Sequence, residues 1–315
     1  MHIKYLKHFT TNVLWLLPCI LSHLLLPCKD CYAANTTTTE GLPLYYWHEN
    51  KEINFGDYLS VKLLERIVGG PITTYEKKPV VLGKKLLALG SILYFAREDD
   101  VVWGSGVSGI RLNKKDYSFR FLDIRAVRGP LTKKFLKENF DLDTPEIYGD
   151  PALLMPYFFP ELKRKENPKY DYIVIPHYRE EKMFPKADNE HIVYPTDYWE
   201  EVVDKILDSE FVISSALHGI VVAEAFGIPA RMLRVSEKEP FLKYQDYYLG
   251  TNRPNFKFAT SIEEALLMGG EEPFECDLKK LYDAFPFDLW PNTTFSSPAF
   301  PIPRSHAANQ TTDLD

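Results

Sequence analysis

Residues 211–229 read FVISSALHGIVVAEAFGIP, and this stretch decides the fold class of the chain. Residues 211–213 form a short apolar run that predicts a buried strand, and residues 220–226 predict a short helix. Gly227-Ile228-Pro229 then ends the helix before a second apolar run at residues 231–235, which predicts another strand. A strand, a helix and a further strand in succession are typical of a parallel α/β sheet.

The same alternation continues along the chain on both sides of this stretch. Further strands are predicted at residues 43–47, 101–103, 122–127 and 172–175, and helices at 58–68, 85–95, 131–139, 198–207, 261–267 and 277–285. The charged segment 163–169 predicts a connection between two α/β lobes, residues 41–165 and residues 166–290. The expected fold class is therefore α/β with two Rossmann-like lobes and a central cleft, in which ligands bind beyond the carboxyl ends of the strands.

Length and composition limit the classes of protein that fit. The 315 residues are 45% hydrophobic and 26% charged, which excludes a collagen-like, coiled-coil or wholly disordered protein. Asp and Glu outnumber Lys and Arg by 44 to 37, and the net charge of −7 argues against a nucleic-acid-binding protein with a broad basic face. The four cysteines match no zinc or disulfide framework.

The two ends of the chain differ in composition from the body. Lys4 and Lys7 precede an apolar run at residues 13–28, and small residues follow, so residues 1–33 are predicted to be a secretory signal peptide or a short signal-anchor. Residues 34–40 form a polar stem, and residues 291–315 are predicted to be a disordered tail. The body is therefore expected in the lumen of the secretory pathway, either free or anchored to a Golgi-like membrane through residues 13–28. A cytoplasmic protein is the alternative.

Polar residues cluster directly after the predicted strands. His218 follows the strand at 211–213 and begins a helix, whose positive end would favour an anionic ligand and lower the pKa of the imidazole. Arg128 follows the strand at 122–127, where a guanidinium can bind a carboxylate or a phosphate. His177 ends the strand at 172–175 and would face the same cleft. A capping or structural histidine and a surface arginine are the alternatives for His218 and Arg128.

Three further features have a structural explanation as well as a functional one. Asp57 either acts on a ligand or only caps the helix that follows. Gly104-Ser105-Gly106 forms either an anion-binding turn of backbone N–H groups or a plain tight turn. Glu224 either meets a hydroxyl group or lies on a solvated helix face. The sequence contains no metal-ligand spacing, no P-loop and no G-x-S-x-G motif.

Taken in order, seven short motifs resemble those of the polysaccharide pyruvyl transferase family. They are NFGD at 54–57, WGSG at 103–106, VRGP at 127–130, GDPALL at 149–154, IPHY at 175–178, SSALHG at 214–219 and KYQDYY at 243–248. The resemblance implies a fold like that of the two-lobed GT-B glycosyltransferases. It also implies transfer of a pyruvyl group from phosphoenolpyruvate to a sugar of a glycan or polysaccharide as a cyclic ketal. Many members have Arg directly before Leu-His-Gly, where this chain has Ala216.

The reaction implied by the resemblance assigns roles to the motif residues. His218 would protonate the enol methylene, Arg128 would bind the donor, and Asp57 or His177 would act as the base, with no metal or other cofactor required. The remaining residues expected to bind substrate are Asn54, Gly56, Gly104, Ser105, Gly106, Asp150, Ser214, Ser215, Leu217 and Glu224. Two alternatives stay open: a GT-B-type glycosyltransferase that uses a nucleotide sugar, and a non-catalytic carbohydrate-binding protein of the same fold.

Overall fold

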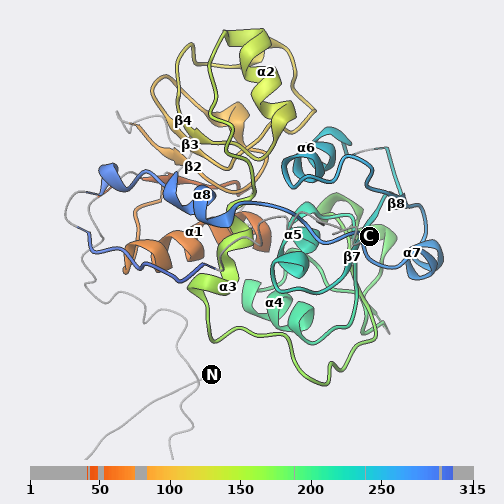
Figure 1. Ribbon diagram of the computed structural model, residues 1–315. Helices are drawn as coiled ribbons and strands as arrows, with labels where there is room; N and C mark the ends of the chain where they lie inside the picture. The colour runs from red at the N-terminus through yellow and green to blue at the C-terminus, as the bar shows by residue number, and fades with distance from the viewer. Residues whose placement is uncertain are drawn as a thin grey trace, which may run out of the picture. The chain divides into compact units, whose positions relative to one another are not determined.

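The chain forms an α/β fold with two four-stranded parallel sheets, shown in a computed structural model (Figure 1). The structure describes residues 41, 43–48, 53–74, 84–187, 189–237, 239–290 and 293–300, all of which belong to one compact unit, Thr37–Asp315. The predicted signal segment 1–33 and polar stem 34–40 lie outside the described residues. In the described part of the chain, no helix combines the length and the apolar character needed to span a membrane.

Each sheet is built from strands in the order in which they occur along the chain. The first contains β1 (Leu44–Tyr45), β2 (Leu86–Leu87), β3 (Val101–Trp103) and β4 (Asp123–Ala126). The second contains β5 (Ile173–Ile175), β6 (Val212–Ser214), β7 (Ala230–Leu233) and β8 (Phe258–Ala259). Isolated parallel bridges also pair Thr74 with Leu44 of β1 and Ile192 with Val174 of β5, on the sides away from β2 and β6. The order therefore reverses beside the first strand of each sheet, which is the arrangement of the switch point at which ligands bind in doubly wound sheets.

The helix predicted at residues 85–95 is wrong. Residues Leu86–Leu87 form strand β2 between β1 and β3, and only Leu93–Phe95 turn, as a short 3₁₀ helix η1. Leu86 and Leu87 are fully buried, because a central parallel strand is covered on both faces. A short apolar run of this kind has no periodicity that separates a strand from a buried helix. Gly90, with φ of +97°, ends the segment in a conformation that a helix cannot include.

The helices confirm most of the predicted positions, but α1 and α5 each begin three residues earlier than predicted, and α2 begins one residue earlier. They are α1 (Phe55–Val68), α2 (Pro130–Phe140), α3 (Met155–Phe158), α4 (Trp199–Leu207), α5 (Leu217–Ala225), α6 (Leu242–Gly250), α7 (Ile262–Met268) and α8 (Leu278–Asp283). Short 3₁₀ helices lie at η2 (Lys114–Asp116), η3 (Pro151–Leu154), η4 (Tyr178–Met183) and η5 (Phe287–Leu289). Helix α1 begins at Phe55 because the Asn54 side chain accepts a hydrogen bond from the Gly56 N–H. The earlier start of α5 places His218 inside the first turn rather than before it.

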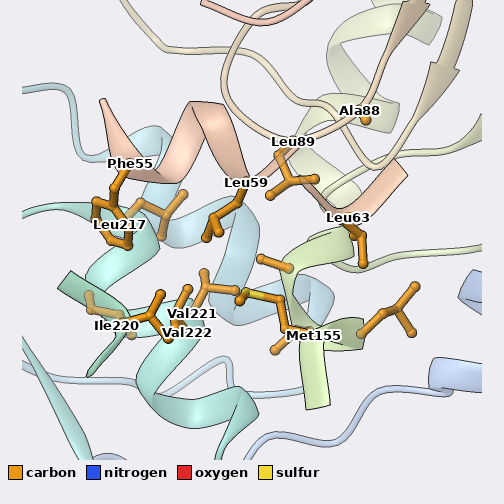
Figure 2. Packing of buried hydrophobic residues seen from close by; sticks show 14 of the residues in the cluster. Phe55, Leu59, Leu63, Ala88, Leu89, Met155, Leu217, Ile220, Val221 and Val222 are labelled. Carbon is orange, nitrogen blue, oxygen red and sulfur yellow. The ribbon is translucent and has the colours of Figure 1, made fainter. Parts of the chain in front are cut away.

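One hydrophobic cluster joins α1 to α5 and takes in residues from both sheets. Figure 2 shows Phe55 of α1 against Leu217 of α5, with Leu59 and Met155 further along the same contact. The N-terminal turns of the two helices meet, because a Cβ atom built on Gly56 would lie 2.1 Å from His218 Nδ1. The packing of α1 on α5 therefore brings Asp57 and His218 into one site.

The described part of the predicted disordered tail packs against the body. The Phe295 ring lies 4.7 Å from that of Phe287, and the Phe300 ring lies 4.8 Å from that of Tyr157. Residues 291–292 and 301–315 lie outside the described residues. Residues 293–300 thus cover apolar surface that their serine- and threonine-rich composition does not suggest.

Candidate functional site

A cavity of about 430 Å³ lies beyond the carboxyl ends of β1, β2 and β3 of the first sheet and of β5 and β6 of the second. Its lining comes from the segments after β1, β2, β3, β5 and β6, from the start of α1, and from the start of α6 with the segment before it. The polar and charged lining residues are Asn54, Asp57, Ser91, Ser108, Arg111, His177, Arg179, His218, Glu239 and Lys243. The volume suits a small substrate, and the location agrees with the expectation drawn from the sheet topology.

His218 lies on the cavity wall between two carboxylates. Its Nε2 is 3.4 Å from Asp150 Oδ2, and the other oxygen of Asp150 accepts a hydrogen bond from the Ala152 N–H at 3.0 Å. Burial lowers the pKa of His218, but the charges of Asp150 and Asp57 outweigh burial, so the pKa is raised above its ordinary value. The predicted depression of this pKa by the helix N-terminus is therefore wrong, because two buried carboxylates act more strongly than the end of a nine-residue helix.

Asp57 lies in the first turn of α1 and lines the same cavity. Asn54, and not Asp57, caps the helix, so the Asp57 carboxylate does not serve as the N-cap. Loss of hydration raises the pKa of Asp57 to about 6, against the opposing effects of His218 and Lys243. A carboxylate with this pKa can take up and release a proton near neutral pH.

His177 is a neutral imidazole whose ring nitrogens both face partners. Burial lowers its pKa to about 2, with further contributions from the charges of Lys243 and Arg179. Nδ1 accepts a hydrogen bond from the Arg179 N–H at 3.4 Å, which places the ring proton on Nε2, 3.3 Å from Glu239 Oε2. Because the lone pair of His177 Nδ1 already accepts the Arg179 N–H, Asp57 is better placed than His177 to accept a proton from a substrate.

Sequence comparison with known proteins supports the resemblance over the range that holds six of the seven motifs. The sequence model of the family described as polysaccharide pyruvyl transferase matches residues 54–237. This chain belongs to the polysaccharide pyruvyl transferase family.

The chain is also similar to two known proteins and to one solved structure. It is 27% identical over 237 residues to an uncharacterized protein of Acanthamoeba polyphaga mimivirus, an alignment that covers 71% of this chain and 80% of the viral protein. It is 28% identical over 237 residues to the succinoglycan biosynthesis protein ExoV of Rhizobium meliloti, covering 71% of each chain. A crystal structure of an uncharacterized Klebsiella pneumoniae protein aligns with a TM-score of 0.40 and 11% identity, over 70% of this chain and 94% of the other.

Five of the family-motif residues predicted to act at the site line the cavity, and the others lie outside its lining. The lining residues are Asn54, Asp57, His177, Leu217 and His218. Gly56 lies behind His218, where only a residue without a Cβ leaves room for the imidazole. Asp150 also lies behind His218 and acts on it through its carboxylate.

Arg128 is fully buried and does not line the cavity. Its guanidinium donates to Asp246 Oδ2 at 3.1 Å, to Ser91 Oγ at 2.6 Å and to the Val107 carbonyl at 2.7 Å. The same Asp246 carboxylate accepts from the N–H groups of Leu131 and Thr132 at the start of α2. Arg128 thus joins strand β4 and helix α2 to helix α6, and direct donor binding by Arg128 stays a prediction.

The Gly104-Ser105-Gly106 turn lies outside the cavity lining and serves close packing. Ser105 Oγ donates to the Gly90 carbonyl at 3.0 Å. A Cβ at Gly106 would lie 2.6 Å from the Arg128 guanidinium carbon, and Gly104 adopts φ of +86° against Pro151. These contacts fit the tight turn that the sequence offered as the alternative.

The predicted serines and Glu224 make buried hydrogen bonds within the protein. Ser214 Oγ donates to the Ile175 and Ala216 carbonyls, and Ser215 Oγ donates to Glu180 Oε2 at 2.6 Å while accepting from the His177 N–H at 2.8 Å. Glu224 accepts from the two terminal guanidinium nitrogens of Arg253, at 2.7 and 2.8 Å, and from the Tyr247 hydroxyl. Ser215 therefore positions His177, whereas Glu224 fixes the end of α5 away from the cavity.

Sequence reasoning missed the charged residues that lead into α6. Lys243 and Glu239 line the cavity, and Arg179 and Arg111 line it from other segments. Lys243 is the first residue of the KYQDYY motif, and the sequence alone indicates no role for this lysine. Within the described residues, no group of three His, Cys, Asp or Glu side chains has the geometry of a metal site.

Proposed function

We propose that the protein transfers the pyruvyl group of phosphoenolpyruvate to two hydroxyl groups of a sugar in a glycan or polysaccharide and forms a cyclic ketal. Membership of the family and similarity to ExoV support a pyruvyltransferase of polysaccharide biosynthesis. The observation that carries the finer proposal is the position of His218 on the cavity wall, between Asp150 and Asp57 and with a raised pKa. A histidine that keeps its proton near neutral pH is suited to act as a general acid.

In this proposal, protonated His218 donates its proton to the methylene carbon of the donor, and the central carbon becomes electrophilic. A sugar hydroxyl attacks that carbon and gives its proton to Asp57, whose pKa of about 6 suits a base. The bond from carbon to the phosphate oxygen then breaks, and a second sugar hydroxyl closes the ketal. One of the two hydroxyl protons replaces the proton given by His218, and the other leaves with phosphate.

The arrangement of the two sheets and the cellular compartment are part of the same proposal. We place the two sheets in a GT-B-like arrangement of two lobes, and the acceptor in the secretory pathway with the chain anchored or targeted by residues 1–33. Phosphoenolpyruvate carries a carboxylate and a phosphate, and the cationic lining residues Lys243, Arg179 and Arg111 suit such a donor. The glycosyltransferase alternative receives no comparable support, since Glu224 is bound to Arg253 and lies outside the cavity lining.

Thermal unfolding in the presence of candidate donors tests the proposal. We expect phosphoenolpyruvate, and not a UDP-sugar, to raise the unfolding temperature, since a ligand at a hundredfold excess over its Kd adds about 2.7 kcal/mol to stability. His218→Gln should keep this shift but lose about 10²- to 10⁴-fold in turnover, because it removes proton transfer. His191→Gln, on a partly exposed histidine outside the cavity lining, is the matched control. Stabilisation by the nucleotide sugar alone would contradict pyruvyl transfer.

A further inference from the structure

The cavity wall has a charged part and an aromatic part. In the charged part, His177 Nε2 and Lys243 Nζ lie 3.3 and 3.6 Å from oxygens of the Glu239 carboxylate. The aromatic part consists of Trp47, Tyr94, Phe95 and Tyr178. Phosphoenolpyruvate has two anionic groups and no ring, so its chemistry suits the charged part. The aromatic part suits a second ligand that has an apolar face.

Two of these rings form a corner between the two sheets. Trp47 follows β1 and Tyr178 follows β5, and their ring centroids lie 5.1 Å apart with the ring planes inclined by 43°. Both side chains are half-buried, whereas Trp103 is fully buried. The Arg111 guanidinium lies 3.8 Å from the centroid of the Tyr94 ring and covers that ring. The aromatic corner, Trp47 and Tyr178, is therefore better placed than Tyr94 to offer ring surface to a ligand.

The aromatic corner is fixed to the start of α1, which carries the proposed base. Tyr46, the residue before Trp47, packs edge-to-face on Tyr58, the residue after Asp57, with ring centroids 5.9 Å apart. Trp47 and Asp57 both line the cavity. A ligand held on the aromatic corner therefore shares the cavity with the carboxylate that is proposed to accept a proton from a hydroxyl group.

A sugar ring has the chemistry that such a corner recognises. One face of a pyranose carries C–H groups that pack on an aromatic ring, while the hydroxyl groups project from the edge and reach polar side chains. Aromatic side chains supply a large contact area at a low cost in conformational entropy. A nucleobase also stacks on aromatic rings, so it has to be distinguished from a sugar by experiment.

We infer that the aromatic corner is the acceptor subsite, in which the C–H face of the terminal sugar ring packs on the Trp47 indole. The inference rests on the proposed function and deepens it, because it assigns residues to the acceptor. The hydroxyl groups at the edge of the sugar ring are then turned toward Asp57. Trp47 and Tyr178 act on the affinity for the acceptor and take no part in proton transfer.

Binding of the methyl glycosides of glucose, galactose and mannose to the full-length chain tests this inference. Each probe has a C–H face, so we expect binding of at least one, with saturation-transfer NMR showing the strongest transfer to ring C–H protons. Trp47→Leu keeps an apolar side chain but removes the ring face, and it should weaken this binding at least about 10-fold. Trp47→Phe keeps a ring and should restore most of the affinity. Trp199→Leu, at another half-buried tryptophan outside the cavity lining, is the matched control.

Donor binding and turnover separate this role from a structural one. Calorimetry should show that Trp47→Leu binds phosphoenolpyruvate as tightly as the unaltered protein does. Phosphate release with the glycoside that binds most tightly should show a raised KM for that glycoside at a nearly unchanged kcat, which is the result of losing substrate binding alone.

The possible results distinguish the two proposals. Absence of phosphoenolpyruvate binding by the unaltered protein would overturn the proposed function. Binding of phosphoenolpyruvate without binding of any of the three glycosides would overturn only the inference, as would equal glycoside binding by Trp47→Leu and the unaltered protein. A large fall in the unfolding temperature of Trp47→Leu, or weaker donor binding, would also overturn it. Binding of UDP that depends on Trp47 would assign the corner to a nucleobase and overturn both proposals.

Discussion

At the scale of single residues, Asp57 and His218 acquire their proton affinities from each other and from Asp150. The Asp57 carboxyl has a pKa near 6 because it has lost hydration, and His218 has a raised pKa because both carboxylates face it. His177, which lines the same cavity beside Lys243 and Arg179, is shifted the opposite way. Two histidines on one cavity wall therefore have pKa values shifted in opposite directions, and His218 is the better suited of the two to donate a proton.

The raised pKa of Asp57 predicts a specific pH dependence of stability. The folded state binds the Asp57 proton more tightly than the unfolded state, in which the pKa is 3.8. The contribution of Asp57 to the free energy of unfolding is therefore greatest below pH 3.8 and is lost as pH rises through about 6. Asp57→Asn should therefore be more stable than the unaltered protein at about pH 8, with the difference shrinking at about pH 4.5. Urea unfolding at the two pH values measures the difference in the free energy of unfolding. The control is Asp204→Asn, at an exposed aspartate.

The same residue predicts a loss of activity on acidification. If ionised Asp57 accepts the hydroxyl proton, turnover by the unaltered protein should decline as pH falls through about 6. Asp57→Asn should have low turnover at every pH. A variant that keeps the turnover of the unaltered protein would exclude Asp57 as the base.

At the scale of elements, the residues at the start of α1 allow close contact with α5, although one of them lowers the stability of the helix. Asn54 caps the helix, Gly56 admits the His218 ring, and Asp57 completes the site. Glycine in a helix costs about 1 kcal/mol relative to alanine. The NFGD motif accepts this cost so that two helix N-termini can meet.

Gly56→Ala tests this explanation. The new methyl group would lie 2.1 Å from His218 Nδ1, so the imidazole must move away from Asp57 and Asp150. We expect turnover to fall at least about 100-fold, as for other losses of a positioned acid, while stability changes by no more than about 1–2 kcal/mol. Ser60→Ala, on the same helix, is the matched control, because the buried Ser60 hydroxyl has no hydrogen-bond partner within the described residues. Full activity in Gly56→Ala would show that the His218 position is not critical.

At the scale of the whole molecule, buried contacts between residues far apart in the chain hold the site together. Arg128 and Asp246 are separated by 118 positions and are both fully buried. The cluster that includes α1 and α5 also takes in Leu86 of the first sheet and Ile173 of the second. The cavity depends on these contacts, because both sheets contribute to its walls.

This organisation predicts one cooperative unfolding transition and a large effect of Arg128→Ala. Removal of one partner of a buried ion pair typically costs about 3–5 kcal/mol, because the other charge is left uncompensated. We expect Arg128→Ala to lose that much stability in urea, with tryptophan fluorescence and circular dichroism reporting the same midpoint. Arg120→Ala, on a side chain that is 92% exposed, should change stability by less than about 0.5 kcal/mol. Two separate transitions would show that the two sheets unfold independently.

The sequence by itself determined the α/β class, most strand and helix positions and the family. These follow from periodicity and short motifs, which depend on neighbouring residues. It also pointed to His218, Asp57, His177, Asn54 and Leu217, all of which line the cavity. It could not identify strand β2, because a short buried apolar run has no distinguishing period.

Only the tertiary structure decided which charges are free to act. Arg128, Glu224 and Lys243 look alike in sequence, as charged residues within or near motifs. In the folded protein, Arg128 is held by Asp246 and Glu224 by Arg253, whereas Lys243 lines the cavity with Glu239 3.6 Å away as its ion-pair partner among the described residues. The physical reason is that desolvation and pairing depend on side chains brought together by folding, from positions that no local pattern connects.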